Sequence, residues 1–301
     1  MTTTRLLRKG IPLLALGACL SLGISNQSHA TEGGGGAYAN GIEGFGAGML
    51  PPPGTYFLNY VNVYTARDFN NADGDSAVPG FKLDVAANVF RLVHMTKHQL
   101  LGGTWGMQLI LPVMYMDVST PGGSQSKTGL GDIVVDPILL AYHTKNFHYA
   151  LGLDIIVPTG AYDQNDLANL GRNYWTFEPV VAATYLNEAG CEASVKLMYD
   201  FNTENSDTDY KSGQEFHLDY TLAKRFGAFT LGAGGYYYKQ VTNDKSNGVT
   251  VADSKGQVLA LGPQFKYDYK NMSFSVKYQH EMLVENKPEG EKFWFNLLYA
   301  F

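Results

Sequence analysis

The carboxyl-terminal stretch of the chain carries a large apolar side chain at every second position. Counting back from the last residue, these positions are Phe301, Tyr299, Leu297, Phe295 and Phe293. Side chains alternate between the two faces of a β-strand, so all five project from one face of a strand over 292–301. A face this apolar needs either a protein core or a membrane around it.

The same alternation recurs along the chain and predicts twelve strands separated by turn signals. In the third of them, Trp105, Met107, Leu109 and Leu111 share one face, while the opposite face is polar or small. A soluble β-sandwich also alternates, so the pattern alone fits both a sandwich and a barrel. The predicted strands are 55–67, 81–94, 104–117, 131–143, 147–157, 174–186, 191–202, 214–225, 228–241, 257–269, 272–284 and 292–301.

The connections between these strands separate the two alternatives, because long and short connections alternate almost throughout. The connection at 158–173 is long, for example, and the next one, at 187–190, is short. Transmembrane barrels of the bacterial outer membrane have tight turns at one rim and larger loops at the other. In lipid every backbone group must be paired internally, which closes the sheet. The sequence therefore predicts an all-β fold, a transmembrane antiparallel β-barrel of about twelve strands over 55–301.

Residues 1–30 have the pattern of a secretory signal peptide. Arg5, Arg8 and Lys9 precede an apolar run, and Ser28-His29-Ala30 fits a cleavage site. Leu16-Gly17-Ala18-Cys19 resembles a lipobox, so lipidation at Cys19 is the alternative. Elsewhere no segment reaches the ~18–20 apolar residues of a spanning helix. An exported chain of this kind is expected in the bacterial outer membrane.

Charge and cysteine content argue against nucleic acid as a partner and against an internal disulfide. Without Arg5, Arg8 and Lys9, the 22 basic residues fall to 19 against 28 acidic ones, a net charge of −9 for the mature chain. Nucleic acid is therefore not an expected partner, because its binding requires basic patches. Cys191 is the only cysteine beyond the signal, so no internal disulfide is expected. No motif indicates a cofactor.

Short glycine-rich and proline-containing motifs occur in a characteristic order. They are Gly33-Gly34-Gly35-Gly36, Gly44-Phe45-Gly46-Ala47-Gly48, Pro51-Pro52-Pro53-Gly54, Gly129-Leu130-Gly131-Asp132, Asp136-Pro137, Glu178-Pro179, Gly234-Gly235-Tyr236 and Leu261-Gly262-Pro263-Gln264. The set resembles the SphA-like family, named for the meta pathway of phenol degradation. The resemblance implies an outer-membrane barrel associated with uptake of small hydrophobic or aromatic compounds. The terminal strand ending in Phe301 is similar to those of outer-membrane barrels, which implies contact with membrane lipid and recognition by the barrel assembly machinery.

The Gly/Pro-rich segment 31–54 precedes the barrel and has too few large apolar residues to form a core. Two interpretations remain open. Glycine permits tight backbone paths, so the segment could fold into the lumen as a plug. Alternatively, it is a flexible periplasmic tail ahead of a rigid Pro51-Pro52-Pro53 entry.

Charged side chains opposite the apolar faces are predicted to line the lumen, because a Lys or Arg facing lipid at mid-bilayer costs ~2–4 kcal/mol. Both signs occur, which suits a hydrated pore or a wall closed by salt bridges. The predicted lumen-lining residues are Asp154, Glu178, Lys196, Asp200, Glu215, His217, Asp219, Lys266, Lys277 and Glu281. Prolines within strands, at Pro112, Pro137, Pro179 and Pro263, predict bulges or kinks.

An enzyme is the competing class. His217, between Glu215 and Asp219, is the best candidate for a general base of a lipid hydrolase. It has no visible nucleophile partner, so no catalytic residue is assigned. The acidic run 68–75 does not have the spacing of a known calcium loop, and no metal ligand is assigned. We expect a non-enzymatic channel for small hydrophobic or aromatic compounds, with a lipid hydrolase and a structural or surface-interaction barrel as alternatives.

Overall fold

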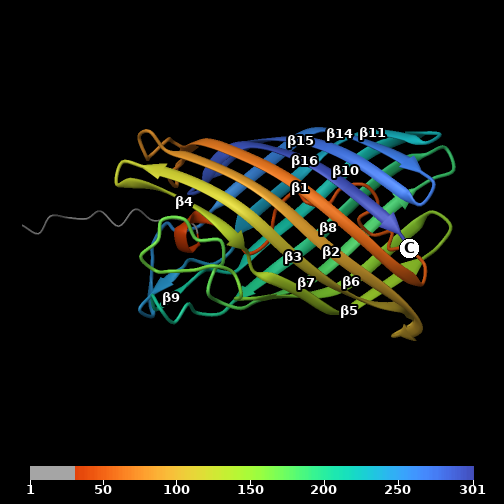
Figure 1. The fold of residues 1–301 in the computed structure, drawn as a ribbon, viewed down its shortest axis with the longest axis horizontal. Coiled ribbons are helices and arrows are strands. Elements are labelled where there is room, and N and C mark those ends of the chain that lie inside the picture. Colours follow the sequence, from red (N-terminus) through yellow and green to blue (C-terminus); the bar gives the residue numbers. More distant parts are fainter. Residues whose placement is uncertain (1–30) are drawn as a thin grey trace, which may run out of the picture.

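The computed structural model describes residues 31–301 as a closed antiparallel β-barrel (Figure 1). The predicted signal peptide and the lipidation alternative at Cys19 lie outside the described residues. Each barrel strand pairs with its neighbours, and β1 pairs with β16 to close the sheet, so the predicted fold and strand number are confirmed. The twelve strands are β1 (Gly54–Phe69), β2 (Lys82–Leu100), β3 (Gly103–Thr120), β5 (Ile133–His143), β6 (Phe147–Val157), β7 (Thr176–Leu186), β8 (Cys191–Asn202), β10 (Glu215–Phe226), β11 (Phe229–Gln240), β14 (Gln257–Tyr269), β15 (Met272–Glu285) and β16 (Pro288–Ala300).

The closing strand β16 turns its apolar face outward. Phe293 and Phe295 are 51% and 48% exposed, and they pair with Val63 and Val61 of β1. Trp294, on the opposite face, is only 2% exposed because it points into the barrel. A soluble sandwich would bury the phenylalanines, whereas a membrane barrel presents them to lipid.

The two rims of the barrel differ as predicted. Connections of only a few residues, such as 101–102 and 227–228, form the short-turn rim. The first strand, β1, begins at this rim and the last strand, β16, ends there. The opposite, long-loop rim carries the one-turn 3₁₀ helix η1 (Glu32–Gly34) and the short strands β4 (Gly123–Leu130), β9 (Tyr210–Lys211), β12 (Lys245–Ser246) and β13 (Val249–Thr250). Among residues 31–301, no helix has the length and apolarity required to cross a membrane.

Three predicted connections differ in the structure. The loop expected at 118–130 is a hairpin, because β4 pairs with the upper part of β3 from Val113 onward. β2 continues to Leu100 instead of ending at 94, and β16 begins at Pro288 instead of 292, which leaves only Asn286 and Lys287 in the last connection. The sequence did not predict these extensions because the added residues are mostly polar or proline, and such residues do not alternate between apolar and polar positions.

Only one of the four strand prolines coincides with a register shift. The pairing of β5 with β6 shifts between Val135 and Leu140, around Pro137. The ladders through Pro112, Pro179 and Pro263 keep their register on the strands that pair with them. No bulge is therefore present at those three positions, because a proline removes one donor but does not force an extra residue into the strand; the kinks expected there stay a prediction.

Aromatic residues gather on the outer surface near the short-turn rim. Tyr142 and Tyr149 stack with ring centroids 4.7 Å apart, and Phe147 lies 4.8 Å from Tyr185. Phe229 stacks on Tyr267 in the same way. Such rings form the girdles that mark the edge of the hydrocarbon layer around membrane barrels.

We predict that Val181→Arg destabilises the barrel in lipid by about 2–4 kcal/mol, because it places a charge in the lipid-facing belt. Val181 lies at the centre of β7, is 47% exposed, and pairs with Leu151 and Leu197. Denaturant titration of the refolded protein in lipid vesicles measures the loss. Phe226→Arg, at the short-turn rim, is the control and should cost roughly 0–1 kcal/mol; equal losses in both variants would contradict the assignment of the belt.

Candidate functional site

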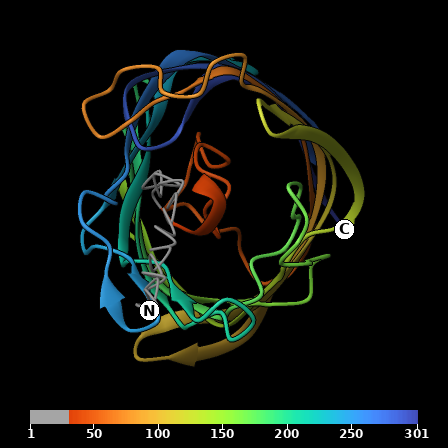
Figure 2. The ribbon, with the colours of Figure 1, turned by 90° about the vertical axis from the view of Figure 1, so that its left-hand side faces the viewer.

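The chain ahead of the barrel lies inside the lumen. We call residues 31–53 the lumen segment; Figure 2 shows it, in red to orange, within the ring of strands. It enters beside the long-loop rim, where Glu32 accepts hydrogen bonds from Asn205 and Thr208 at 2.7 Å. From there it descends along one side of the lumen to Gly54, where β1 begins.

Two oppositely charged wall residues hold the turn at 41–43 of this segment. The Asp219 carboxylate accepts hydrogen bonds from the backbone N–H groups of Gly41 and Glu43, at 2.8 and 2.9 Å. The Lys277 ammonium donates to the carbonyl oxygens of Gly41, Ile42 and Glu43, at 2.6–2.8 Å. Hydrogen bonds to an ionised group are stronger than neutral ones, so this clamp is a strong anchor of the lumen segment.

Further contacts fix the segment to the same side of the barrel. The backbone N–H of Gly46 donates to Glu192, and that of Gly48 donates to Thr184. A Cβ at Gly48 would stand 2.6 Å from the backbone of Ala183. Close approach of backbone to wall therefore explains why glycine occupies this position.

The opposite side of the lumen stays open and is apolar. A cavity of about 910 Å³ lies between the lumen segment and the inner faces of β2 and β3. It begins at the long-loop rim, at Pro121 and Leu167, and reaches inward to Arg91. The inner faces of these two strands contribute Leu83, Val85, Ala87, Val89, Ile110, Pro112, Met114, Met116 and Val118.

A polar layer crosses the barrel at the inner end of this cavity. The Arg91 guanidinium pairs with Glu43 of the lumen segment at 2.5 Å and donates to Gln108 at 2.7 Å. Gln108 donates in turn to Asp154, whose carboxylate lies 3.6 Å from Lys196. Below this layer, Tyr56, Val93 and Met95 pack with residues of β5 in an apolar cluster. The cavity therefore has a charged floor and an apolar layer beneath it.

The structure places the side chains of all ten predicted lumen-lining residues on the inner face of the barrel. Asp154, Glu178 and Lys196 border the cavity, whereas Asp219 and Lys277 contact the lumen segment. Lys266 lies 5.7 Å from the ring of Phe45. Glu281 pairs with Lys292 at 3.3 Å. Their part in a passage stays a prediction.

The remaining three predicted residues, Asp200, Glu215 and His217, are buried together near Glu178. The His217 Nε2 atom lies 3.3 Å from Asp200 and 3.4 Å from Glu178. Neither ring nitrogen has a hydrogen-bond partner among the described residues, so no nucleophile is positioned for the hydrolase alternative.

Sequence reasoning missed several residues that shape the lumen. Arg91 and Gln108 were not among the predicted lumen residues, although each is the polar member of an otherwise apolar inner row. Glu43 is the acidic residue within the glycine-rich segment that meets Arg91. A charge inside an apolar period-two row was the signal that could have identified Arg91.

Comparison with known proteins identifies the family. The family model described as the putative MetA-pathway of phenol degradation matches residues 66–297. The chain belongs to this family. The sequence resemblance to the phenol-degradation family is thus confirmed. No protein in the curated sequence set matches this chain significantly.

Solved structures show the fold that this member of the phenol-degradation family adopts. An outer-membrane channel from Pseudomonas putida F1 superposes with a TM-score of 0.74 at 18% sequence identity, covering 84% of this chain and 97% of that one. The β domain of the Bordetella autotransporter BrkA superposes with a TM-score of 0.50 at 12% identity, covering 83% of this chain and 100% of that one. At such identities the likeness shows the fold, which is that of a bacterial outer-membrane barrel.

We predict that Lys277→Met loosens the lumen segment, because it removes the donor to three carbonyl groups that lie away from water. The expected result is a higher single-channel conductance in planar bilayers and faster proteolysis near Gly41. Lys266→Met is the matched control: this lysine also lies on the inner wall, but within residues 31–301 it contacts Phe45 and Asp268 and does not bond to the segment backbone. Unchanged conductance and proteolysis in Lys277→Met would show that the clamp does not anchor the segment.

Proposed function

We propose that the protein is a passive channel of the bacterial outer membrane for small hydrophobic or aromatic compounds. The observation that carries the proposal is the division of the lumen into two unlike halves. One half holds the lumen segment on a charged wall, and the other is a cavity of about 910 Å³ against an apolar wall. The cavity begins at the long-loop rim, which is the external rim in barrels of this kind.

The apolar wall favours apolar solutes by elementary solvation. A compound that leaves water for the inner faces of β2 and β3 loses unfavourable apolar hydration. A sugar or an ion would lose hydrogen bonds to water and find few partners along Val85, Ala87 and Met114. An apolar protein cavity of roughly 150 Å³ suffices to hold benzene, so a single aromatic ring fits this cavity with room to spare.

In this proposal the lumen segment is a plug. The floor of the cavity depends on Glu43 of the segment, which pairs with Arg91 of β2. A solute that passes the floor requires this pair to separate or the segment to shift. The alternative of a flexible periplasmic tail has less support, because the segment is bonded to the wall at several points between Glu32 and Gly48.

The comparisons lend support at the level of fold and family. The P. putida protein is described as an outer-membrane channel, and the family is named for a pathway of phenol degradation. A lipid hydrolase finds no support at His217, for want of a bonded nucleophile among the described residues. A structural or surface-interaction barrel remains the outcome if transport assays fail.

We predict that Ala87→Trp reduces uptake of a small aromatic hydrocarbon by cells that produce the barrel, because the indole narrows the cavity along the β2–β3 wall. Ala87 borders the cavity on β2. Its neighbour Ala86 faces outward and is exposed, so Ala86→Trp is a control with the same added volume on the lipid side. The measurement is the initial rate of accumulation of labelled toluene, with barrel amounts matched by heat-dependent gel mobility.

The expected result is slow uptake for Ala87→Trp and wild-type uptake for Ala86→Trp. Equal rates in the two variants and the wild type would argue against passage along the β2–β3 wall. If the wild-type barrel itself gave no uptake above empty cells, the structural interpretation would replace the channel.

A further inference from the structure

Four carboxylates lie side by side in one row across adjacent strands of the lumen wall. Asp154 on β6 pairs with Glu178 on β7. Phe177 pairs with Phe201 and Val180 with Met198, which sets Glu178 opposite Asp200 on β8. Asp200 pairs in turn with Glu215 on β10. Like charges directly opposite each other destabilise a sheet, so something must neutralise this row.

The outer two carboxylates of the row accept hydrogen bonds and the inner two do not. Asp154 accepts from Gln108 at 2.8 Å and lies near Lys196, and Glu215 accepts from Asn202 at 2.8 Å. Both oxygens of Glu178 and both of Asp200 are buried without a hydrogen-bond partner. No lysine or arginine within residues 31–301 forms an ion pair with either of them. Buried carboxylates are costly unless they are paired or coordinate a metal.

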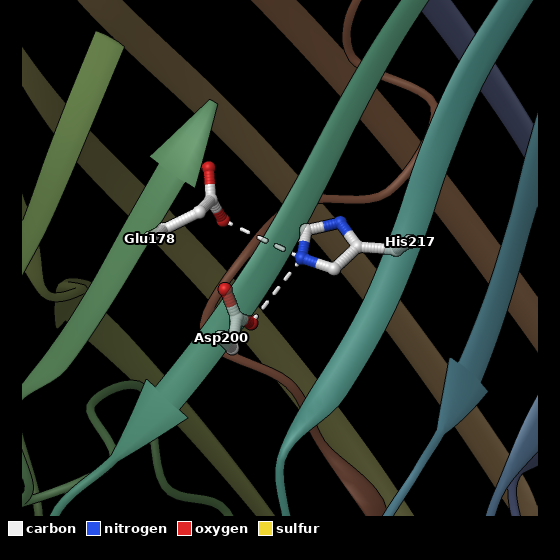
Figure 3. A group of neighbouring side chains, drawn as sticks. All are labelled: Glu178, Asp200 and His217. Atoms are coloured by element: carbon white, nitrogen blue, oxygen red, sulfur yellow. Dashed lines mark ion pairs between the residues drawn. The ribbon is translucent and has the colours of Figure 1, made fainter. Parts of the chain in front are cut away.

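A ring nitrogen of His217, on β10, lies beside the two inner carboxylates. Figure 3 shows Glu178 and Asp200 turned toward one imidazole nitrogen. The distances from Nε2 are 3.4 Å to Glu178 and 3.3 Å to Asp200, yet neither contact has hydrogen-bond geometry. The three side chains are each at most 1% exposed, and the atoms that could coordinate a metal lie within 4.8 Å of one another.

We propose that Glu178, Asp200 and His217 bind a divalent transition-metal ion, with zinc as the reference ion. A tetrahedral zinc ion with ligand bonds of about 2.0–2.1 Å holds its ligands about 3.3–3.4 Å apart, which matches the two distances from His217 Nε2. The imidazole favours zinc and its neighbours, because magnesium and calcium take oxygen ligands. The sequence assigned no metal ligands, and this site departs from that expectation.

The surroundings define what the ion would do. The ring of Tyr38 from the lumen segment lies 4.9 Å from the His217 ring, so the segment covers the site. Bound metal would join β7, β8 and β10 under the segment and cancel the repulsion between the two inner carboxylates. Metal-bound histidines usually donate through the second ring nitrogen, but His217 Nδ1 has no such partner among the described residues. The described residues therefore give His217 no supporting hydrogen bond.

The test is zinc binding by the complete mature barrel, refolded in detergent after removal of metal with EDTA. Titration calorimetry with zinc alone should show one tight site in the wild type, and zinc should raise the temperature at which the folded gel band is lost. His217→Gln and Glu178→Gln should each weaken binding by more than the roughly 10–100-fold that loss of a supporting hydrogen bond costs a metal site.

The exposed pair His143 and His148, with Nδ1 atoms 2.9 Å apart at a turn, requires a control. His148→Gln disrupts this pair and should leave the tight site intact. Loss of the zinc signal in His148→Gln, or full binding in both His217→Gln and Glu178→Gln, would overturn the proposal. No zinc binding by the folded wild type would also overturn it and would favour a proton shared by the two inner carboxylates. Glu178→Gln keeps the size of the side chain, so it decides the matter if His217→Gln fails to fold.

Discussion

Pairing of β1 with β16 is the contact on which the rest of the structure depends. In a membrane an open sheet edge would leave a row of N–H and C=O groups without partners, and each would cost several kcal/mol. The ladder from Tyr56 and Ala300 to Phe69 and Pro288 removes both edges at once. Closure then separates two environments, and alternation sends the phenylalanines of β16 to one and Trp294 to the other. The charged lumen is possible only because this separation exists.

Between the long-loop rim and the Arg91 layer, polarity inside the barrel is distributed by side. The strands from β6 to β15 carry the acids and lysines that hold the lumen segment, whereas β2 and β3 present a largely apolar surface. The segment packs where it finds partners for its backbone and leaves the apolar half free. Arg91 is the exception on the apolar side, and its pairing with Glu43 ties the segment across the lumen. The open space is thus a consequence of where the charges lie.

Much of this arrangement could be predicted from the chain because alternation is a local property. Lipid requires a strict contrast between the two faces of a strand. The alternation of Trp105, Met107 and Leu109 therefore predicts their strand and its outward face without information on the adjacent strands. The inward direction of Asp219 and Lys277 follows from the same argument. Strand ends were less certain, as at Pro288, because solvated rims impose no contrast between faces.

The contacts within the lumen could not be predicted, because they depend on register between strands and on the path of a glycine-rich segment. Glu178 and Asp200 stand 22 positions apart in sequence, and only the pairing of Phe177 with Phe201 brings them opposite each other. Likewise, no local pattern shows that Asp219 would meet Gly41. Position in an inner row says that a charge faces water or another charge, but it does not say which one.

Asp219 and Lys277 bond to backbone N–H and C=O groups of residues 41–43 and form no hydrogen bond to the side chains of these residues. Gly41 must stay small, since a Cβ there would meet Gln279 at 2.3 Å and its φ is +84°. The side chain of Ile42 is held by packing, beside Tyr60, Val89 and Trp294. The clamp therefore holds the backbone of this turn, whereas the side chain of Ile42 contributes to the shape of the lumen. A barrel built this way can acquire a wider or narrower bore through a change of side chain at Ile42, while the clamp still holds the lumen segment in place.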